Sequence, residues 1–596
     1  MYGFNGKMLR VNLKTKTIKT ESLGKDLAEK FIGGRGLGTK IMMDEVDPKV
    51  DALSPENKLL IVTGPMTGNP VATGGRYMVV TKSPLSGTIA SSNSGGRWGA
   101  ELKFAGIDVI IFEDKADDPV YLSIDNEKVE LLPAEDLWGT TVSATTKKLE
   151  EKHAKGCKVL AIGPAGENLS KIAAIINDED RAAGRSGVGA VMGSKNLKAV
   201  VVKGATKPQV YDEEKLKDLN KSQLSRIKEN GVTGQGLPTY GTAVLVNILN
   251  ELGSLPTNNF QLAQFGGAEE ISGETLAEKY LIKNTACYRC PIACGRYVKM
   301  AAGEGGGPEY ETIWSFGSDC GISDMESIIE ANYWCNEMGL DTISAGATIA
   351  AAIELKEKGY ISDSELDGLK LEFGNGTDIA EWVKRMGYRQ GLGNKMTDGS
   401  YRLAEGYGVP ELSMSVKKLE IPAYDPRGVQ GQGLQYATTN RGGCHVRGYL
   451  ISPEVLGIPV QLDRFETKEK ENWTKTYQDL TAVIDSLGVC LFTSFALGAP
   501  DYADMCNVIT GTNHTGESIL EVGDRIWNLE KLFNLKAGIE SSEDTLPKRL
   551  LEEPIPEGPS KGWKHKLDEM LPKYYALRGW TPEGIPTEEK LKELGL

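Results

Sequence analysis

The stretch Cys287-Tyr288-Arg289-Cys290-Pro291-Ile292-Ala293-Cys294 brings three thiols into one short segment. Its spacing, C-x2-C-x3-C, allows one loop to bind a small metal centre, and soft thiolates select zinc or iron–sulfur clusters. A zinc site would usually add a second C-x2-C pair or nearby histidines, which this sequence does not offer at suitable spacing. A radical-SAM enzyme would show the reverse order, C-x3-C-x2-C. Because free thiols rarely cluster this tightly, the stretch predicts an iron–sulfur cluster.

Such a cluster needs a fourth ligand, which must come from elsewhere in the chain. The remaining cysteines are Cys157, Cys320, Cys335, Cys444, Cys490 and Cys506. Spacing alone does not choose among them. Nine cysteines at uneven spacing predict metal ligands and buried thiols rather than a disulfide framework.

Composition and charge limit the classes of protein to which the chain can belong. A chain of 596 residues, with 40% hydrophobic and 25% charged residues, is typical of a globular protein of several domains. The net charge of −14, without a long basic block, argues against a nucleic-acid binder. No apolar run is long enough to span a bilayer, and the N-terminus lacks the apolar segment of a secretion signal. We therefore expect a cytoplasmic protein that binds neither nucleic acid nor membrane.

Hydrophobic patterning predicts an α+β fold. Short apolar runs over residues 1–207 predict the strands Lys7–Leu13, Lys58–Val62, Tyr77–Thr81, Asp108–Phe112, Val120–Ile124, Val159–Ile162 and Lys198–Val202. Glycine clusters predict ligand-binding loops at Gly33–Gly38, Gly74–Arg76, Ser91–Arg97 and Arg181–Gly187. Helical spacing over Asp324–Leu340 and Ala347–Lys358 indicates a mainly helical remainder. The expected order is a β-rich domain (1–207) followed by two mainly α-helical domains (208–414 and 415–596).

A second motif, Asp485-Ser486-Leu487-Gly488-Val489-Cys490, lies far downstream of the cysteine stretch. Together with Cys-x-x-Cys-Pro-Ile-x-Cys, the Asn5-Gly6-Lys7 start and Gly33–Gly36, it resembles the aldehyde:ferredoxin oxidoreductase family along nearly the whole chain. In that family the last cysteine of Asp-x-x-Gly-x-Cys completes a 4Fe-4S cluster. The resemblance therefore implies a pterin-binding N-terminal domain, and a cluster bound by Cys287, Cys290, Cys294 and Cys490.

The resemblance also implies a tungsten (or molybdenum) bis-pterin centre in which no protein side chain binds the metal. Asp341 and Asp485 match the two acidic residues that accept hydrogen bonds from pterin amines. The segment that follows Asp341 lacks the glycine and the cysteine of the stricter pattern, so a helix cap is an alternative role for this residue.

Magnesium bridges the pterin phosphates in the family and is held partly by backbone carbonyls. The matching positions here are Asn93 and Ala182, and neighbouring pterin and phosphate contacts match Arg76, Gly95 and Arg181. Guanidinium groups suit phosphate, and glycine lets backbone N–H groups come close to it.

Oxidation of an aldehyde needs groups that move protons near neutral pH, and a buried Glu and a His are suitable. His445 matches the family's active-site histidine, although a lone histidine is more often structural. Glu311 matches the catalytic carboxylate, with Glu309 as the alternate, and either could instead be a solvated loop charge.

The implied activity is that of an aldehyde:ferredoxin oxidoreductase, which interconverts aldehydes and carboxylic acids with ferredoxin or a small iron–sulfur subunit as electron partner. The alternatives are another tungsten enzyme, such as an aryl-CoA reductase catalytic subunit or a glyceraldehyde-3-phosphate:ferredoxin oxidoreductase, and a non-catalytic electron-transfer subunit. The last would need no pterin site. Some relatives hold an iron between subunits through Glu and His. Because no histidine lies between His153 and His445, we expect any homodimer to lack that iron.

Overall fold

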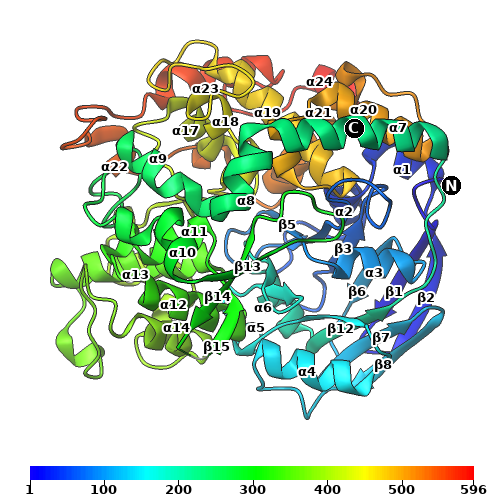
Figure 1. Ribbon diagram of the computed structural model, residues 1–596, viewed down its shortest axis with the longest axis horizontal. Coiled ribbons are helices and arrows are strands. Elements are labelled where there is room, and N and C mark those ends of the chain that lie inside the picture. The colour runs from blue at the N-terminus through cyan, green and yellow to red at the C-terminus, as the bar shows by residue number, and fades with distance from the viewer. Residues whose placement is uncertain (302) are drawn as a thin grey trace.

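The computed structural model describes residues 1–301 and 303–596, and it combines a β-rich N-terminal part with a mainly helical remainder (Figure 1). This arrangement confirms the predicted α+β class. In the part of the chain that the structure describes, no helix is both long and apolar enough to cross a membrane.

Two six-stranded sheets make up the N-terminal part. The first has the order β2-β1-β6-β3-β4-β5, with β1 (Lys7–Asn12), β2 (Thr17–Ser22), β3 (Leu59–Thr63), β4 (Tyr77–Lys82), β5 (Ile89–Ser94) and β6 (Val109–Glu113). The second has the order β11-β10-β9-β12-β7-β8, with β7 (Val120–Asp125), β8 (Lys128–Pro133), β9 (Lys158–Ala161), β10 (Ile175–Asn177), β11 (Arg181–Ala183) and β12 (Leu197–Lys203). Each sheet has one parallel pair, β1 with β6 and β7 with β12.

Alternation along the strands sends side chains to both faces of each sheet. Ile61 and Phe112 of the first sheet share one core cluster with Leu122 and Val200 of the second, so the two sheets pack face to face. Helix α3 (Trp98–Phe104) contributes to the same core. A fully buried side chain of this kind stabilises the fold by about 1.5–3 kcal/mol. The β-rich part therefore has its own core.

Helices cover the outer faces of this sandwich. Helix α2 (Gly34–Glu45) packs Leu37, Ile41 and Met42 against the first sheet, and α4 (Val142–Lys152) covers the second. The other helices of the N-terminal part are α1 (Lys25–Phe31), α5 (Pro164–Glu167) and α6 (Val188–Ser194).

All seven predicted strands are present with their ends within one residue of the prediction. The prediction of a loop at Gly33–Gly38 is wrong, because residues from Gly34 onward form the start of α2. A Cβ on Gly34 would lie 2.2 Å from the backbone oxygen of Asp485, and one on Gly36 would lie 2.6 Å from Ile526. The glycines therefore allow α2 to approach the helical part closely. Residues 91–94 of the third predicted loop belong to β5, and residues 181–183 of the fourth belong to β11.

Helices dominate the chain from residue 213 onward. The first group is α7 (Glu213–Glu229), α8 (Leu237–Tyr240), α9 (Leu245–Glu251), α10 (Gly273–Lys279), α11 (Tyr310–Phe316), α12 (Met325–Met338), α13 (Thr342–Glu357), α14 (Ile379–Gly387), α15 (Gly393–Met396) and α16 (Ser400–Gly406). The second group is α17 (Gln430–Thr438), α18 (Ile451–Glu454), α19 (Lys470–Leu487), α20 (Ala499–Thr510), α21 (Gly516–Lys536), α22 (Lys548–Glu552), α23 (Leu567–Leu577) and α24 (Glu588–Leu594). The two predicted helices correspond to α12 and α13.

Short strands interrupt the helical part where the sequence did not indicate them. Strands β13 (Leu281–Thr285), β14 (Gly295–Met300) and β15 (Gly303–Gly306) form a small antiparallel sheet, and β16 (Ser415–Val416) pairs with β17 (Leu419–Glu420). The cysteine stretch is the connection between β13 and β14. This sheet therefore fixes both ends of the loop that carries three of the nine thiols.

Candidate active site

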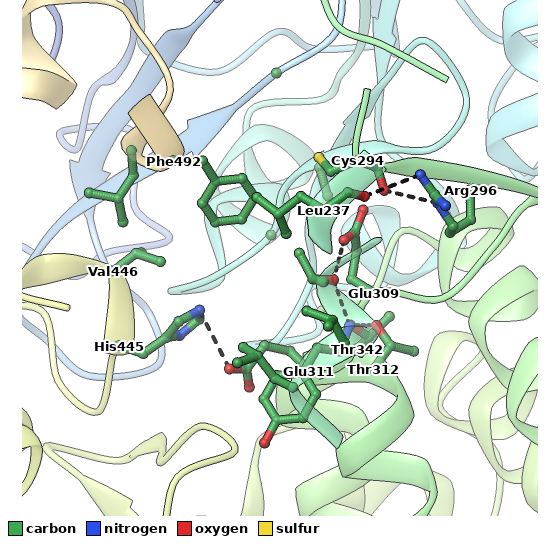
Figure 2. A pocket seen from close by; sticks show the side chains of 18 of the residues that line it. Leu237, Cys294, Arg296, Glu309, Glu311, Thr312, Thr342, His445, Val446 and Phe492 are labelled. Carbon is green, nitrogen blue, oxygen red and sulfur yellow. Dashed lines mark hydrogen bonds and ion pairs between the residues drawn. The ribbon is translucent and has the colours of Figure 1, made fainter. Parts of the chain in front are cut away.

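A cavity of about 520 Å³ lies between the N-terminal sheets and the helical part. Its lining includes nine of the predicted site residues: Arg76, Gly95, Arg181, Ala182, Cys287, Cys294, Glu311, Asp341 and His445. They come from segments that are hundreds of residues apart in the sequence, and Figure 2 shows part of the lining. The fold thus gathers most of the predicted site into one space.

Glu311 and His445 face each other across this cavity (Figure 2). His445 Nε2 lies 3.5 Å from Glu311 Oε1, and both side chains keep a small exposed fraction, 15% and 13%. Burial raises the pKa of Glu311 to about 8. Burial, together with the nearby guanidinium groups of Arg185 and Arg441, lowers the pKa of His445 well below its usual range. At neutral pH the pair therefore consists of a protonated carboxyl group and a neutral imidazole.

Glu311 is held through one oxygen and is free at the other. Its Oε2 accepts a hydrogen bond of 3.1 Å from the backbone N–H of Ala423, whose carbonyl in turn accepts one of 2.8 Å from the hydroxyl of Tyr310. Glu311 Oε1 and His445 Nδ1 have no hydrogen-bond partner among the described residues. Both atoms are buried, although they belong to residues that line the cavity.

Glu309, the alternate catalytic carboxylate, lies in a different environment. Its side chain is 42% exposed, its Oε2 accepts a hydrogen bond of 2.6 Å from Thr242, and its Oε1 lies 3.6 Å from Arg181. A solvated, paired carboxylate of this kind has no free buried oxygen to offer.

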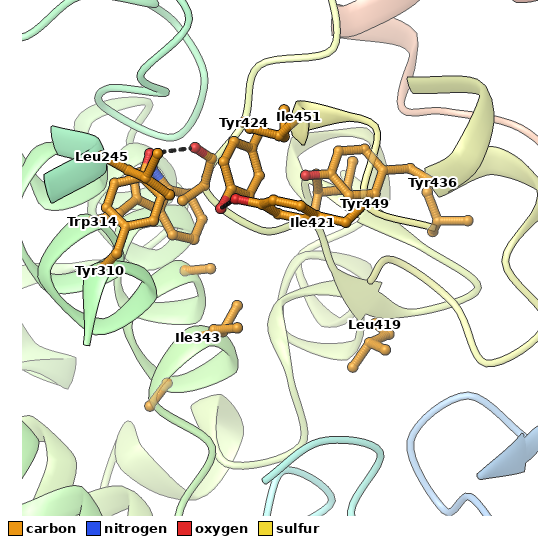
Figure 3. Close-up of a cluster of buried hydrophobic side chains, with 14 of the residues drawn as sticks. Leu245, Tyr310, Trp314, Ile343, Leu419, Ile421, Tyr424, Tyr436, Tyr449 and Ile451 are labelled. Atoms are coloured by element: carbon orange, nitrogen blue, oxygen red, sulfur yellow. Dashed lines mark hydrogen bonds between the residues drawn. The ribbon is translucent and has the colours of Figure 1, made fainter. Parts of the chain in front are cut away.

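Two tyrosines that the sequence did not predict, Tyr424 and Tyr449 (Figure 3), pack next to His445. The hydroxyls of Tyr424 and Tyr449 lie 3.0 Å apart, and both rings pack within about 6 Å of the imidazole. One hydrogen is used in the bond between the two hydroxyls, and the other has no acceptor among the described residues. Because both residues line the cavity, the pair can donate one hydrogen bond into it. No spacing rule links two distant tyrosines, so only the fold brings them together.

The rest of the substrate side of the cavity is apolar. Its lining includes Val244, Leu245, Ile248, Val446, Leu456, Leu491, Phe492 and Phe495. An apolar wall with a few convergent polar groups is typical of a site for small organic molecules.

Four thiols surround a second, smaller cavity next to the first. Cys287, Cys290, Cys294 and Cys490 all line it. Among residues 1–301 and 303–596, no three Cys, His, Asp or Glu side chains come close enough together to bind one metal ion. Four thiols around one small cavity match the ligand count of an iron–sulfur cluster. Burial raises the pKa of Cys290 to about 11.

Arg76 and Arg181 lie between the two cavities and line both of them. Arg76 Nη2 donates to the Sγ of Cys490 over 3.2 Å, and its Nη1 donates to Asn93 over 3.1 Å. Arg181 donates to the hydroxyl of Thr285 over 3.1 Å. Two cationic side chains thus connect the thiol cavity to the larger one.

Asn93 and Asp485 do not line either cavity. Asp485, in the last turn of α19, accepts hydrogen bonds from Asn93 over 3.1 Å and from Arg447. Its position behind Arg76 gives it an indirect connection to the site, through Asn93.

Asp341 lines the larger cavity and also caps α13. Its Oδ1 accepts from the backbone N–H of Ile343 over 3.1 Å, and its Oδ2 accepts from Ser344 over 2.7 Å and from Arg185 over 3.1 Å. The helix-cap alternative is therefore observed in this structure.

A group of buried arginines behind the cavity was also missed in the sequence. Arg35, Arg185, Arg441 and Arg447 are all at least nine-tenths buried. The Nε atoms of Arg441 and Arg447 have no partner among the described residues. Buried arginine with an unused N–H suits an anionic ligand. Arg441 and Arg447 flank His445 in sequence, which is the one signal that pointed to them.

Two family models match the chain. The model described as "Aldehyde ferredoxin oxidoreductase, N-terminal domain" matches residues 8–204, and the one described as "Aldehyde ferredoxin oxidoreductase, domains 2 & 3" matches residues 218–596.

Similar proteins carry the same family description. Proteins named "Tungsten-containing aldehyde ferredoxin oxidoreductase" from Pyrococcus furiosus and Thermococcus kodakarensis are 54% and 53% identical to the chain, and each comparison covers 100% of the chain and 99% of the relative. A solved structure, "Active site complex BamBC of Benzoyl Coenzyme A reductase in complex with 1,5 Dienoyl-CoA", has a TM-score of 0.87 and 26% identity, and covers 100% of this chain and 97% of its own.

Proposed function

Because this chain belongs to the aldehyde ferredoxin oxidoreductase family of tungsten-containing oxidoreductases, we propose that it interconverts aldehydes and carboxylic acids with ferredoxin as electron partner. The observation that carries the proposal is the pairing of Glu311 with His445 in an apolar cavity that adjoins four cysteine thiols. The relatives' shared name favours this activity over aryl-CoA reduction and over oxidation of glyceraldehyde 3-phosphate.

The donor set of the site fits a bis-pterin centre with its phosphates and a 4Fe-4S cluster. Buried N–H groups without partners and the cationic Arg76 and Arg181 suit anionic pterin phosphates, and four thiols around a cavity suit the cluster. When bound, the tungsten bis-pterin accepts two electrons and the cluster passes them on singly.

Asn93 and Ala182 would supply backbone carbonyls to Mg²⁺. They lie in β5 and β11, which are edge strands of the two sheets. Edge strands have carbonyl groups that the sheet leaves unpaired, and oxygen ligands suit this ion. Asp341 and Asp485 would hold the pterins, Asp341 from the cavity wall and Asp485 from behind Arg76.

Conversion of an aldehyde and water into a carboxylic acid releases two electrons and two protons. Ionised Glu311 would take a proton from the attacking water, and its raised pKa makes it a stronger base than an ordinary glutamate. The Ala423 N–H and the Tyr310 hydroxyl behind it would keep the carboxylate aimed at that water.

His445 would bind the substrate carbonyl as a hydrogen-bond donor and not as an acid, because its lowered pKa keeps the imidazole neutral. The free hydrogen of the Tyr424–Tyr449 pair would donate a second bond to the same oxygen. Two donors on one oxygen stabilise the negative charge that develops there as water attacks. The apolar wall favours uncharged aldehydes over phosphorylated ones.

Several further expectations belong to this proposal. Any homodimer would lack an iron between its subunits, and the domain division would be residues 1–207, 208–414 and 415–596. The electron partner would be ferredoxin or a small iron–sulfur subunit.

Metal analysis and an aldehyde-dependent dye assay test the proposal together. Purified protein should contain about one tungsten and about four irons per chain, and should reduce benzyl viologen with several uncharged aldehydes. Active protein without tungsten or molybdenum would refute it. Pterin-free protein that still bound iron would favour a simple electron-transfer subunit.

A further inference from the structure

The loop that carries three of the cluster cysteines lies in a segment without acidic residues. Residues 279–303 contain no Asp or Glu, although 82 of the 596 residues are acidic and the whole chain has a net charge of −14. The same segment contains five basic residues: Lys279, Lys283, Arg289, Arg296 and Lys299. The charge of this segment is thus opposite in sign to that of the protein.

One of these basic side chains is used within the fold, and a second lies opposite an acidic residue. Arg296 is buried and donates hydrogen bonds to backbone carbonyls, including those of Ala293 and Cys294. Lys299 on β14 lies opposite Glu304 on β15. Lys283 and Arg289 are exposed and lie on either side of the first cluster cysteine in sequence.

A third exposed cation, Arg97, comes from the N-terminal part. The backbone N–H of Tyr288 donates to the carbonyl of Gly96 over 2.9 Å, which puts Arg97 next to the cysteine loop. Burial raises the pKa of the Tyr288 hydroxyl, and the charges of Arg289 and Arg97 oppose that rise. Among the described residues, none of Arg97, Lys283 and Arg289 forms an ion pair with a carboxylate, and Lys283 Nζ lies 4.7 Å from the centre of the Tyr297 ring.

The carboxylate of Asp178 also lies close to this surface. Asp178 accepts hydrogen bonds from the backbone N–H groups of Arg97 and Trp98, and these donors partly compensate its charge. Three exposed cations against one compensated anion leave the surface positive.

The cysteine loop reaches the protein surface here, because Ala286 and Arg289 are exposed. Cys287, Cys290 and Cys294 are partly exposed, whereas Cys490 is buried. The backbone carbonyl of Arg289 accepts from Thr73, whose hydroxyl accepts from the N–H of Cys490, so the loop and the fourth cysteine are held together. An electron carrier that bound here would lie next to the loop that holds three of the cluster cysteines.

We infer that the surface formed by Arg97, Lys283 and Arg289 around Tyr288 is the docking site of a small acidic electron-carrier protein. The inference rests on the proposed function and specifies its electron partner. Each encounter would reduce one carrier by one electron, so two encounters would remove the two electrons released by one aldehyde. Redox partners of this kind bind through small interfaces and depend on charge steering for fast association.

Charge reversal of the holoenzyme tests this docking site. In the double variant Arg97→Glu/Lys283→Glu, the KM for an acidic 4Fe-4S ferredoxin should rise about tenfold or more at low salt, and the rate should lose its salt dependence. Benzyl viologen, a small dication, should be reduced at least as fast as by the wild type. Lys561→Glu, at an exposed position without an ion pair, is the matched control and should leave both acceptors unaffected.

An unchanged KM for ferredoxin in the double variant would overturn the inference. A parallel loss of rate with both acceptors would also overturn it, because the charges would then act on the cluster or the active site instead of docking. Direct binding of oxidised ferredoxin, compared between wild type and variant, tests the surface even if the wild type oxidises no aldehyde. Failure of the proposed function would appear in the wild-type dye assay alone.

Discussion

The ionisation of Glu311 should control the pH dependence of aldehyde oxidation. Burial raises the pKa of this carboxyl group from 4.5 to about 8. At pH 6 only about one side chain in a hundred is therefore ionised and able to act as a base. We expect the rate to rise about tenfold per pH unit between pH 6 and 8 and to level off above about pH 8. Initial rates of benzyl viologen reduction with an uncharged aldehyde measure this profile.

Substitution of the carboxyl group should remove both the rate and its pH dependence. Glu311→Gln keeps the shape of the side chain and its contact with Ala423, but it cannot accept a proton, so kcat should fall by about 100- to 10,000-fold. Tungsten, pterin and iron contents should stay at wild-type levels. Glu309→Gln changes a carboxylate two residues away that is exposed and paired. This control should keep the wild-type profile.

The raised pKa of Glu311 also affects stability in a defined direction. The unfolded chain ionises near pH 4.5 but the folded protein only near pH 8, so folding loses stability as pH rises between these values. A shift of this size corresponds to at most about 5 kcal/mol. Glu311→Gln should therefore raise the melting temperature relative to wild type at pH 9 and leave it nearly unchanged at pH 4.

Two results would refute this account of Glu311. One is a wild-type rate that stays flat between pH 6 and 8. The other is a profile that shifts in Glu309→Gln but survives in Glu311→Gln, which would make Glu309 the base.

Other substitutions separate the remaining parts of the site. The Tyr424–Tyr449 pair has one free hydrogen, so the double variant Tyr424→Phe/Tyr449→Phe should lower kcat/KM by about tenfold or more. The single Phe variant that keeps the substrate-facing hydroxyl should have a smaller effect. Equal rates in the double variant and both single variants would contradict this role. Cys490→Ser should lower the iron content and the dye-reduction rate together, and full retention of iron would exclude it as a ligand. Gly34→Ala puts a Cβ 2.2 Å from a backbone oxygen of α19, whereas Gly106→Ala meets nothing within 4 Å although both glycines have positive φ. Gly34→Ala should therefore lower the free energy of unfolding by about 1–3 kcal/mol more than Gly106→Ala does. An equal fall in the melting temperature of the two variants would contradict the packing argument.

Local sequence patterns predicted the sheets and the cysteine loop because both depend on nearby residues. Short apolar runs mark each of the seven predicted strands, and C-x2-C-x3-C marks the loop between β13 and β14. The glycines at residues 33–38 show the limit of such patterns. Glycine favours loops in isolation, but here it allows α2 to pack against a backbone oxygen of α19, more than 400 residues away in the sequence. Only the tertiary structure decides between the two uses.

The buried cations behind the cavity could not be predicted for a related reason. Arginine is usually exposed, and the sequence gives no sign that Arg35 will pair with Glu530 through two hydrogen bonds of 2.7 Å in the interior. Such a pair persists only when the surrounding fold supplies partners for every N–H, because an uncompensated buried charge costs several kcal/mol. Arg441 and Arg447 differ from this pair, because their Nε atoms have no partner among the described residues.

The unpartnered N–H groups and the raised pKa of Glu311 have a common physical origin. Both result from the burial of polar groups away from water, and both cost stability in the protein alone. An anionic ligand that accepted hydrogen bonds from Arg441 and Arg447 would remove the first cost. Binding of such a ligand should therefore stabilise the fold. A melting temperature that did not depend on pterin content would contradict this coupling.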